Sequence, residues 1–182
     1  MKGLTLTVGI ASLVLPTSAA QAGIITIGDG FARACYEASE RHMATPATLE
    51  TCHRALREQA LDEQDVVATH VNRGIIYYLM GNLRAAHVDY DRAIALNPNQ
   101  PEAWLNKGMA TLKGGDSEGA APLFERALQL RTVRPALAYY GRAIVHEDRG
   151  NVRQAYADLQ RARELEPKWT LPADELKRFI VR

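Results

Sequence analysis

The sequence predicts an all-α fold, built as a stack of antiparallel helix hairpins. A motif recurs roughly every 34 residues, and its three copies span residues 67–100, 101–134 and 136–169. Small and bulky residues recur in register within the copies, and each copy carries a Gly followed by Asn or Asp near its middle. Self-similarity at this period is typical of stacked helical hairpins, which present an extended surface to other chains.

Each predicted hairpin combines small residues with bulky ones at fixed positions. Two helices approach closely only where side chains are small, and a large residue then packs as a knob into the hole. The small residues are Gly74, Gly108 and Ala143 at position 8, Ala86, Ala120 and Ala155 at position 20, and Ala93, Ala127 and Ala162 at position 27. The bulky residues are His70, Trp104 and Tyr139 at position 4, and Tyr90, Phe124 and Leu159 at position 24. The pattern therefore predicts two closely packed helices in each copy.

The turn inside each copy is equally regular. Position 15 is Gly, which tolerates the left-handed conformation that ends a helix, and position 16 is a good N-cap for the next helix. These residues are Gly81, Gly115 and Gly150, followed by Asn82, Asp116 and Asn151. Pro98 and Pro167 end the second helices of their copies, since the residue before a proline disfavours helix. The second copy has Thr132 there, and its proline, Pro135, comes three residues later, which fits one extra residue between the copies.

The registered residues resemble the tetratricopeptide repeat family, which has small residues at positions 8, 20 and 27, aromatic residues at 4, 11 and 24, and proline at 32. The resemblance covers residues 67–169 and implies a right-handed superhelical stack that serves protein–protein interaction. The copies depart from the family pattern at His70, Thr111, Thr132, Ala143, His146 and Leu159. Without its first segment, the chain is also similar to small exported proteins of this family from alphaproteobacteria.

Residues 1–22 have the features of a secretory signal peptide. One lysine precedes a largely apolar, uncharged stretch at residues 4–15, and Ala20-Gln21-Ala22 is a small-x-small cleavage sequence. A membrane anchor is the alternative, but about a dozen apolar residues fall short of the roughly 20 that a spanning helix needs. We therefore expect export to the periplasm of a bacterium, with no membrane-spanning segment after cleavage.

Residues 23–66 are predicted to form a degenerate fourth hairpin. One helix is expected from Phe31 to about His42, and another from Pro46 to Leu61.

The two cysteines, Cys35 and Cys52, lie in this degenerate hairpin. An even number of cysteines in an exported chain favours a disulfide. Two buried free thiols are one alternative, and a metal site that recruits His42 or His53 is another, although no CxxC or HxxxH spacing supports it. In the frame of the tetratricopeptide repeat the cysteines fall at positions 7 and 24, which face each other across a hairpin.

Residues 170–182 are predicted to form a C-terminal capping helix that starts at Pro172 and places Leu176, Phe179 and Ile180 on one side. Such a helix is expected because the apolar face of the last repeat needs a cover.

The family resemblance implies a concave groove lined by the first helix of each repeat. The residues expected to bind a peptide there are Val71, Asn72, Ile75, Tyr78, Leu105, Asn106, Met109, Lys113, Tyr140, Ile144 and Glu147. This groove is apolar with two aromatic rings and few polar groups. Its composition favours a hydrophobic or mildly basic segment as the ligand.

The polar residues of the groove favour binding of an extended peptide over binding of a C-terminal carboxylate. Asn72 and Asn106 share one position of the repeat, and a carboxamide pairs with any peptide backbone because it carries both a donor and an acceptor. Family members that bind extended peptides use such a ladder, although Gly141 interrupts it here and the alternative is that both side chains bond locally. A clamp for a C-terminal carboxylate is disfavoured, since Lys113 is the only groove cation and Glu147 opposes it.

Other functions are disfavoured by composition and spacing. Without residues 1–22 the chain holds 21 basic and 21 acidic residues, a balance that argues against electrostatic binding of nucleic acid. The five histidines are scattered and accompany no nucleophile motif, so we expect neither an enzyme nor a metal or cofactor site. The sequence favours a protein or peptide partner in the groove. A structural subunit that docks into an envelope assembly through its outer face or termini is the alternative.

Overall fold

The computed structural model describes residues 30–179, so the predicted signal peptide, residues 1–22, and the last three residues of the predicted cap lie outside the described part. The described residues fold into helices without a strand, and the predicted all-α stack of antiparallel hairpins is confirmed. The helices are α1 (Phe31–Glu40), α2 (Pro46–Glu58), α3 (Glu63–Leu79), α4 (Leu83–Leu96), α5 (Pro101–Lys113), α6 (Ser117–Gln129), α7 (Pro135–Asp148), α8 (Val152–Leu165) and α9 (Thr170–Leu176).

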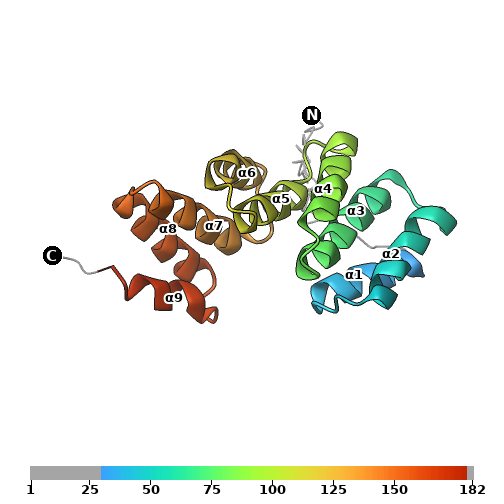
Figure 1. Ribbon diagram of the computed structural model, residues 1–182, viewed down its shortest axis with the longest axis horizontal. Helices are drawn as coiled ribbons and strands as arrows, with labels where there is room; N and C mark the ends of the chain where they lie inside the picture. Colours follow the sequence, from blue (N-terminus) through green and yellow to red (C-terminus); the bar gives the residue numbers. More distant parts are fainter. Residues whose placement is uncertain (1–29, 180–182) are drawn as a thin grey trace, which may run out of the picture.

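Consecutive helices pair into four hairpins that lie side by side along the long axis of the molecule (Figure 1). The pairs α1–α2, α3–α4, α5–α6 and α7–α8 are followed by the single helix α9. The two ends of the stack, α1 and α9, project on the same side of the molecule (Figure 1). Within the described residues, every helix is too short or too polar to cross a bilayer.

The turns inside the hairpins take the predicted conformation. Gly81, Gly115 and Gly150 have φ values of 79°, 88° and 72°, a region that L side chains rarely adopt. The N-cap carboxamide of Asn82 accepts a hydrogen bond from the amide of Ala85, and the N-cap carboxylate of Asp116 accepts one from Gly119. Asn151 is also an N-cap, but its side chain makes no capping hydrogen bond. The glycine turns are therefore confirmed in all three repeats.

Aromatic rings at position 24 fill the centres of two hairpins. Tyr90 and Phe124 are fully buried. A Cβ atom on Gly74 would lie 2.5 Å from the Tyr90 ring, and one on Gly108 would lie 2.9 Å from the Phe124 ring. Glycine at position 8 is therefore what lets the two helices approach over the ring.

The two helices of three hairpins are linked across their interface by a strong pair of side chains. Cys35 on α1 and Cys52 on α2 form a disulfide, with Cα atoms 4.9 Å apart. In the hairpin α3–α4, the guanidinium of Arg73 donates two hydrogen bonds to Asp89, at 2.8 and 2.6 Å. The hairpin α7–α8 repeats this arrangement with Arg142 and Asp158, at 2.7 and 2.8 Å.

The extra residue between the second and third repeats is absorbed in the loop after α6. Arg131 takes a φ of 61°, and the hydroxyl of the buried Thr132 donates to the Glu102 carboxylate at 2.7 Å. The next residue but one, Arg134, reaches the first hairpin and forms an ion pair with Glu40 on α1 at 2.8 Å. The loop between α6 and α7 therefore contacts the first hairpin, which is not its neighbour in the chain.

The C-terminal helix α9 differs from the predicted cap. It begins at Thr170, two residues before Pro172, and ends at Leu176. Proline is tolerated in the first turn of a helix because its missing N–H would have no partner there. Phe179 follows the helix and packs on the ring of Tyr156, with centroids 5.8 Å apart.

Candidate binding groove

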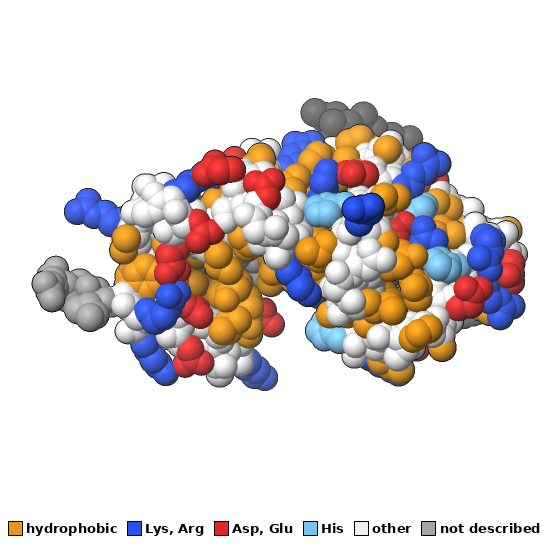
Figure 2. All heavy atoms as spheres, viewed as in Figure 1, with side chains coloured by type: hydrophobic (Ala, Val, Ile, Leu, Met, Phe, Trp, Pro, Cys, Tyr) orange, Lys and Arg blue, Asp and Glu red, His pale blue; other side chains and the backbone are white. Residues whose placement is uncertain are grey.

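Three first helices, α3, α5 and α7, each contribute one apolar residue at position 9 of the repeat. These residues, Ile75, Met109 and Ile144, are only half-buried, so each leaves apolar surface to solvent. We call the three residues the apolar ladder. Hydrophobic side chains also gather over α7 and α9, beside a notch that separates this end of the molecule from α1 (Figure 2). The exposed apolar surface thus recurs from one hairpin to the next.

Two of the predicted apolar groove residues lie in the core instead of on an open surface. Leu105 is fully buried in a cluster with Phe124 and Val145, and Val71 is 4% exposed beside Val67 and Ala103. Both side chains hold neighbouring hairpins together, so they are not available to a ligand.

The two asparagines predicted to form a ladder make internal hydrogen bonds. The buried carboxamide oxygen of Asn72 accepts a bond from the Ser39 hydroxyl of α1 at 3.0 Å. The carboxamide of Asn106 donates to the carbonyl of Glu102, one turn earlier, at 2.8 Å. The first bond links α3 to the preceding hairpin, and the second is the local bond that the sequence left open as an alternative.

Lys113 and Tyr78 form a pair on adjacent first helices. The Lys113 ammonium lies 4.3 Å from the centre of the Tyr78 ring and donates to the Tyr78 carbonyl at 3.3 Å. Burial raises the pKa of the Tyr78 hydroxyl above its ordinary value. The cation therefore already has a ring and a carbonyl as partners.

The acidic end of the groove is met by α9. Arg178 donates two hydrogen bonds to the Glu147 carboxylate, at 3.0 and 2.9 Å. The ring of Tyr140 packs on Trp169 with centroids 5.0 Å apart, and burial raises the pKa of its hydroxyl. The predicted groove residues Tyr140 and Glu147 therefore lie together, but the C-terminal segment covers part of them.

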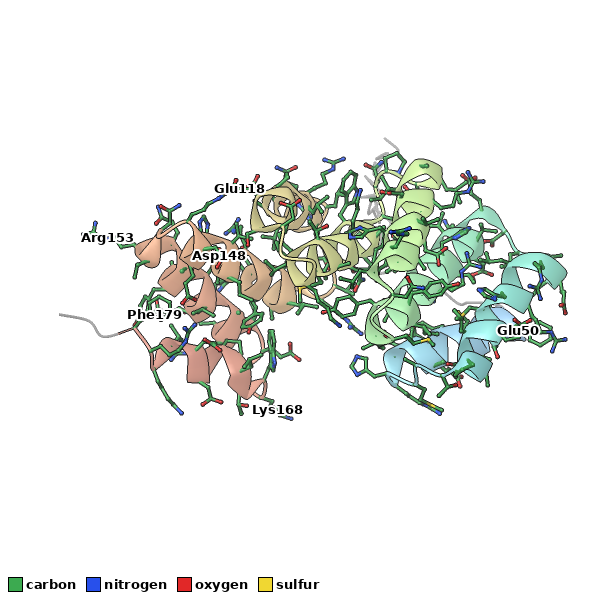
Figure 3. All side chains as sticks on the ribbon, in the orientation of Figure 1. Glu50, Glu118, Asp148, Arg153, Lys168 and Phe179 are labelled. Atoms are coloured by element: carbon green, nitrogen blue, oxygen red, sulfur yellow. A yellow bond between two sulfur atoms is a disulfide. The ribbon has the colours of Figure 1, made fainter. Side chains whose placement is uncertain are left out.

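A pocket of about 290 Å³ opens between α7, α8 and α9. Its lining residues are Tyr140, Ala143, Ile144, Glu147, Asp148, Leu159, Glu175 and Arg178. Figure 3 labels Asp148 at the end of α7 and Phe179 just beyond α9. The Asp148 carboxylate accepts a hydrogen bond from Ser117 on α6. We call this hollow the end pocket.

A second hollow, of about 450 Å³, lies between α4, α5 and α6. It is lined by His87, Lys107, Thr111, Gly114, Asp116, Gly119 and Leu123. Its two charged groups have partners, because Lys107 forms an ion pair with Asp91 at 2.5 Å and Asp116 caps α6.

The buried ion pairs are the polar feature that sequence reasoning missed. Burial alone would raise the pKa of Asp89, but hydrogen bonds from Arg73 and His70 outweigh it and hold the pKa below its ordinary value. A signal was present, since an arginine and an aspartate recur 16 residues apart in two repeats. His70 contacts Asp89 at 2.8 Å, and no group of three His, Cys, Asp or Glu residues in the described part of the chain could hold a metal ion.

Part of the chain is similar to known proteins of one family. Residues 71–135 match the sequence profile described as tetratricopeptide repeat. Human tetratricopeptide repeat protein 16 is 32% identical over 108 residues, which cover 59% of this chain and 12% of that protein. Human tetratricopeptide repeat protein 13 is 31% identical over 71 residues, or 39% of this chain and 8% of that protein. The chain thus spans only a small part of these relatives.

Solved structures share the fold. MamA of Desulfovibrio magneticus RS-1 superposes with a TM-score of 0.61 at 22% identity, covering 82% of this chain and 83% of that one. The OM64 domain from Arabidopsis superposes with a TM-score of 0.58 at 21% identity, covering 65% of this chain and all of that domain. At this level of identity the likeness concerns the fold alone.

Proposed function

Because this chain belongs to the tetratricopeptide repeat family, whose stacks are protein-interaction modules, we propose that it is an exported, non-enzymatic module that binds a peptide or protein segment. The segment lies along the concave side of α3, α5 and α7, against the apolar ladder. The observation that carries the proposal is the recurrence of Ile75, Met109 and Ile144, each half-buried at the same position of successive first helices.

Hydrophobic contact supplies most of the affinity in this proposal. Asn72, Asn106 and Lys113 have internal partners, so a backbone-reading ladder is a smaller part of it than the sequence suggested. The half-buried residues of the apolar ladder still expose apolar surface to solvent. Burying that surface is favourable in proportion to the area removed from water.

Export is part of the proposal and is supported by the Cys35–Cys52 disulfide. Disulfides persist in oxidising compartments such as the periplasm and are rare where thiols are kept reduced. Expression of the full chain with an epitope tag, followed by cell fractionation, tests this part. Recovery of the protein from the cytosol with both thiols free would contradict it.

The groove itself is tested by co-purification of partners from the envelope fraction of the native cells. We expect Met109→Asp with Ile144→Asp to lose a partner that the unaltered chain retains, because a charge at the ladder opposes apolar contact. The matched control is Val88→Asp, since Val88 is 65% exposed on α4, the second helix of its hairpin. Loss of the partner in the control, with retention in the ladder variant, would favour the alternative in which the outer face docks into an envelope assembly.

A further inference from the structure

One hollow lies where the hairpin α5–α6 has smaller side chains than its two neighbours. It is the hollow of about 450 Å³ between α4, α5 and α6, which we call the Thr111 hollow. None of its lining residues is buried, so each of them leaves surface to solvent. Thr111, Gly114 and Gly119 line it at positions 11, 14 and 19 of the repeat. The same positions hold Tyr77, Met80 and Ala85 in α3–α4, and His146, Arg149 and Gln154 in α7–α8. Every one of these side chains is larger than its counterpart around the hollow.

In the preceding hairpin the ring of Tyr77 takes the corresponding place. This ring packs against the cluster that contains Ala86 and Tyr90, and its hydroxyl lies 3.0 Å from Nε2 of His53 on α2. Tyr77 therefore contacts both its own hairpin and the second helix of the hairpin before it. The Thr111 hollow lies between the equivalent helices, α5 and α6 on one side and α4 on the other. The hollow thus has the place of a phenol side chain without that side chain.

The polar lining of the Thr111 hollow complements a phenol. The Lys107 ammonium carries three N–H donors and pairs with Asp91, which leaves donors for an oxygen atom of a ligand. A cation is also attracted to the face of an aromatic ring, and Lys113 over Tyr78, at 4.3 Å, is such a pair on the neighbouring first helices. The imidazole of His87 lines the hollow from α4 and offers a further hydrogen bond.

The Thr111 hollow and the apolar ladder lie on opposite faces of α5. Lys107 and Thr111 are four residues apart, so they share one face of the helix. Met109 is two residues from each of them, which turns its side chain by about 200° around the helix axis. A ligand in the hollow therefore leaves the apolar ladder free.

We propose that the Thr111 hollow is a second binding subsite, which takes a tyrosine side chain of a partner protein. The ring lies beside Thr111 and Leu123, as Tyr77 lies in the hairpin before, and its hydroxyl accepts a hydrogen bond from Lys107. The Asp116 carboxylate also lines the hollow and repels an anionic side chain, a repulsion that a neutral phenol avoids. This subsite goes beyond the proposed function, because it lies outside the groove.

The test uses the purified chain, two-dimensional NMR of its backbone amides and three capped tripeptides. Acetyl-Ser-Tyr-Ser-amide is expected to shift the amides of Thr111 and Leu123. It should bind about tenfold more tightly than acetyl-Ser-Ala-Ser-amide, because burying an aromatic side chain is favourable on this scale. Acetyl-Ser-Phe-Ser-amide, which lacks the hydroxyl, should bind about threefold more weakly than the tyrosine peptide. Equal affinity for the tyrosine and alanine peptides would overturn the proposal.

A filled hollow provides the matched variant. Thr111→Tyr gives α5 the residue that α3 has at the same position, so the chain is expected to fold and to bind the tyrosine peptide about tenfold more weakly. Gly114→Met is a second variant, since φ is −74° at Met80 and −75° at Gly114, and it should weaken binding about threefold. Ala157→Tyr adds the same ring at an exposed site on α8 and should leave binding unchanged. Unchanged binding in both hollow variants would contradict the assignment.

The inference and the proposed function fail separately. If Met109→Asp with Ile144→Asp loses the native partner but Thr111→Tyr keeps the affinity for the tyrosine peptide, only the hollow is wrongly assigned. If the ladder variant keeps the partner and Thr111→Tyr loses the peptide, only the groove proposal fails. Self-association of the unaltered chain in sedimentation, abolished by Thr111→Tyr, would show that a second copy supplies the ring and would overturn the assignment to a separate partner.

Discussion

The hairpin α5–α6, which we call the middle hairpin, and its two neighbours, α3–α4 and α7–α8, have the same fold but different side-chain links. In α3–α4 and α7–α8 an arginine on the first helix binds an aspartate on the second with two hydrogen bonds. In α5–α6 the corresponding residues are Lys107 and Leu123, which cannot form such a pair. Lys107 instead contacts Asp91 on α4, so its charge links two hairpins and not the two helices of one.

The difference shows that the ion pair is not what forms the hairpin. The ring of Phe124 over Gly108 is common to the middle hairpin and, as Tyr90 over Gly74, to its N-terminal neighbour. Once a pair such as Arg73 and Asp89 is buried, however, each partner depends on the other, because an unpaired buried charge is costly. The first hairpin carries the disulfide near the same place, with Cys35 at position 7 like Arg73. The stack therefore combines a ring packed over glycine in two hairpins with polar or covalent links that the hairpin α5–α6 lacks.

The largest effect is expected from breaking the buried pair. Asp89→Ala leaves Arg73 without its carboxylate in a site where Asp89 is 1% exposed, and should lower the free energy of unfolding by about 4 kcal/mol. Urea denaturation followed by circular dichroism measures it. Asp91→Ala, on the same helix, removes the same charge at an exposed site and should cost less than about 1 kcal/mol. Similar losses of unfolding free energy in the two variants would mean that the buried pair stabilises the chain no more than an exposed pair does.

Removal of the disulfide should come next in size. Cys35→Ser with Cys52→Ser opens a link between residues 17 apart and should cost about 3 kcal/mol in the chain-entropy account. The midpoint of urea unfolding of the oxidised chain, compared with the double variant, gives the value. Because the hairpins α3–α4 and α7–α8 keep their ionic links, their amides should keep their protection from hydrogen exchange. A uniform loss of protection along the chain would refute this locality.

Acid should weaken the linked hairpins through Asp89. Its pKa is lowered in the folded chain, so its contribution to stability is complete above the pKa of the unfolded state, near 3.8, and is lost as the pH falls through the folded value. The free energy of unfolding should therefore fall more steeply below about pH 4 in the unaltered chain than in Asp89→Asn, which cannot titrate. Parallel pH profiles for the two chains would remove Asp89 from the acid response.

The smallest effect is expected in the middle hairpin. Lys107→Ala removes an ion pair whose Asp91 side chain is 57% exposed, and should change the free energy of unfolding by about 0.5 kcal/mol or less. The same denaturation measurement applies, at about 0.15 M salt and again at about 0.5 M salt, roughly a threefold higher ionic strength. A loss of unfolding free energy as large as that of Asp89→Ala would show that Lys107 stabilises its hairpin as much as Arg73 does.

The sequence predicted most of the scaffold because each signal was local or recurred in register. Gly81, Gly115 and Gly150 mark turns that the structure contains, and the short spacing of Cys35 and Cys52 placed both in one hairpin. The groove was harder to predict, because burial depends on the neighbouring hairpin. Leu105 looks like a groove residue in its own repeat and becomes buried only when α6 and α7 pack around it.

The partners of Asn72 and Glu102 could not be predicted for a related reason. Asn72 bonds Ser39 in the hairpin where the repeat pattern has decayed, and Glu102 bonds Thr132 in the loop that absorbs the extra residue. Neither partner belongs to the repeating pattern. The end pocket could not be predicted either, because Glu175 and Arg178, which help to line it, lie outside the three repeats.

The ion pair between Arg134 and Glu40 makes the stack depart from a simple linear array of repeats. An array whose units touch only their neighbours behaves as a one-dimensional chain, and its stability is a sum over adjacent units. This contact joins residues 94 positions apart, Glu40 on α1 and Arg134 in the loop between α6 and α7. As an exposed pair it contributes at most about 1 kcal/mol, yet it is a term that a sum over adjacent units leaves out. The first hairpin therefore has a contact with the chain before α7 in addition to its contacts with its sequence neighbour.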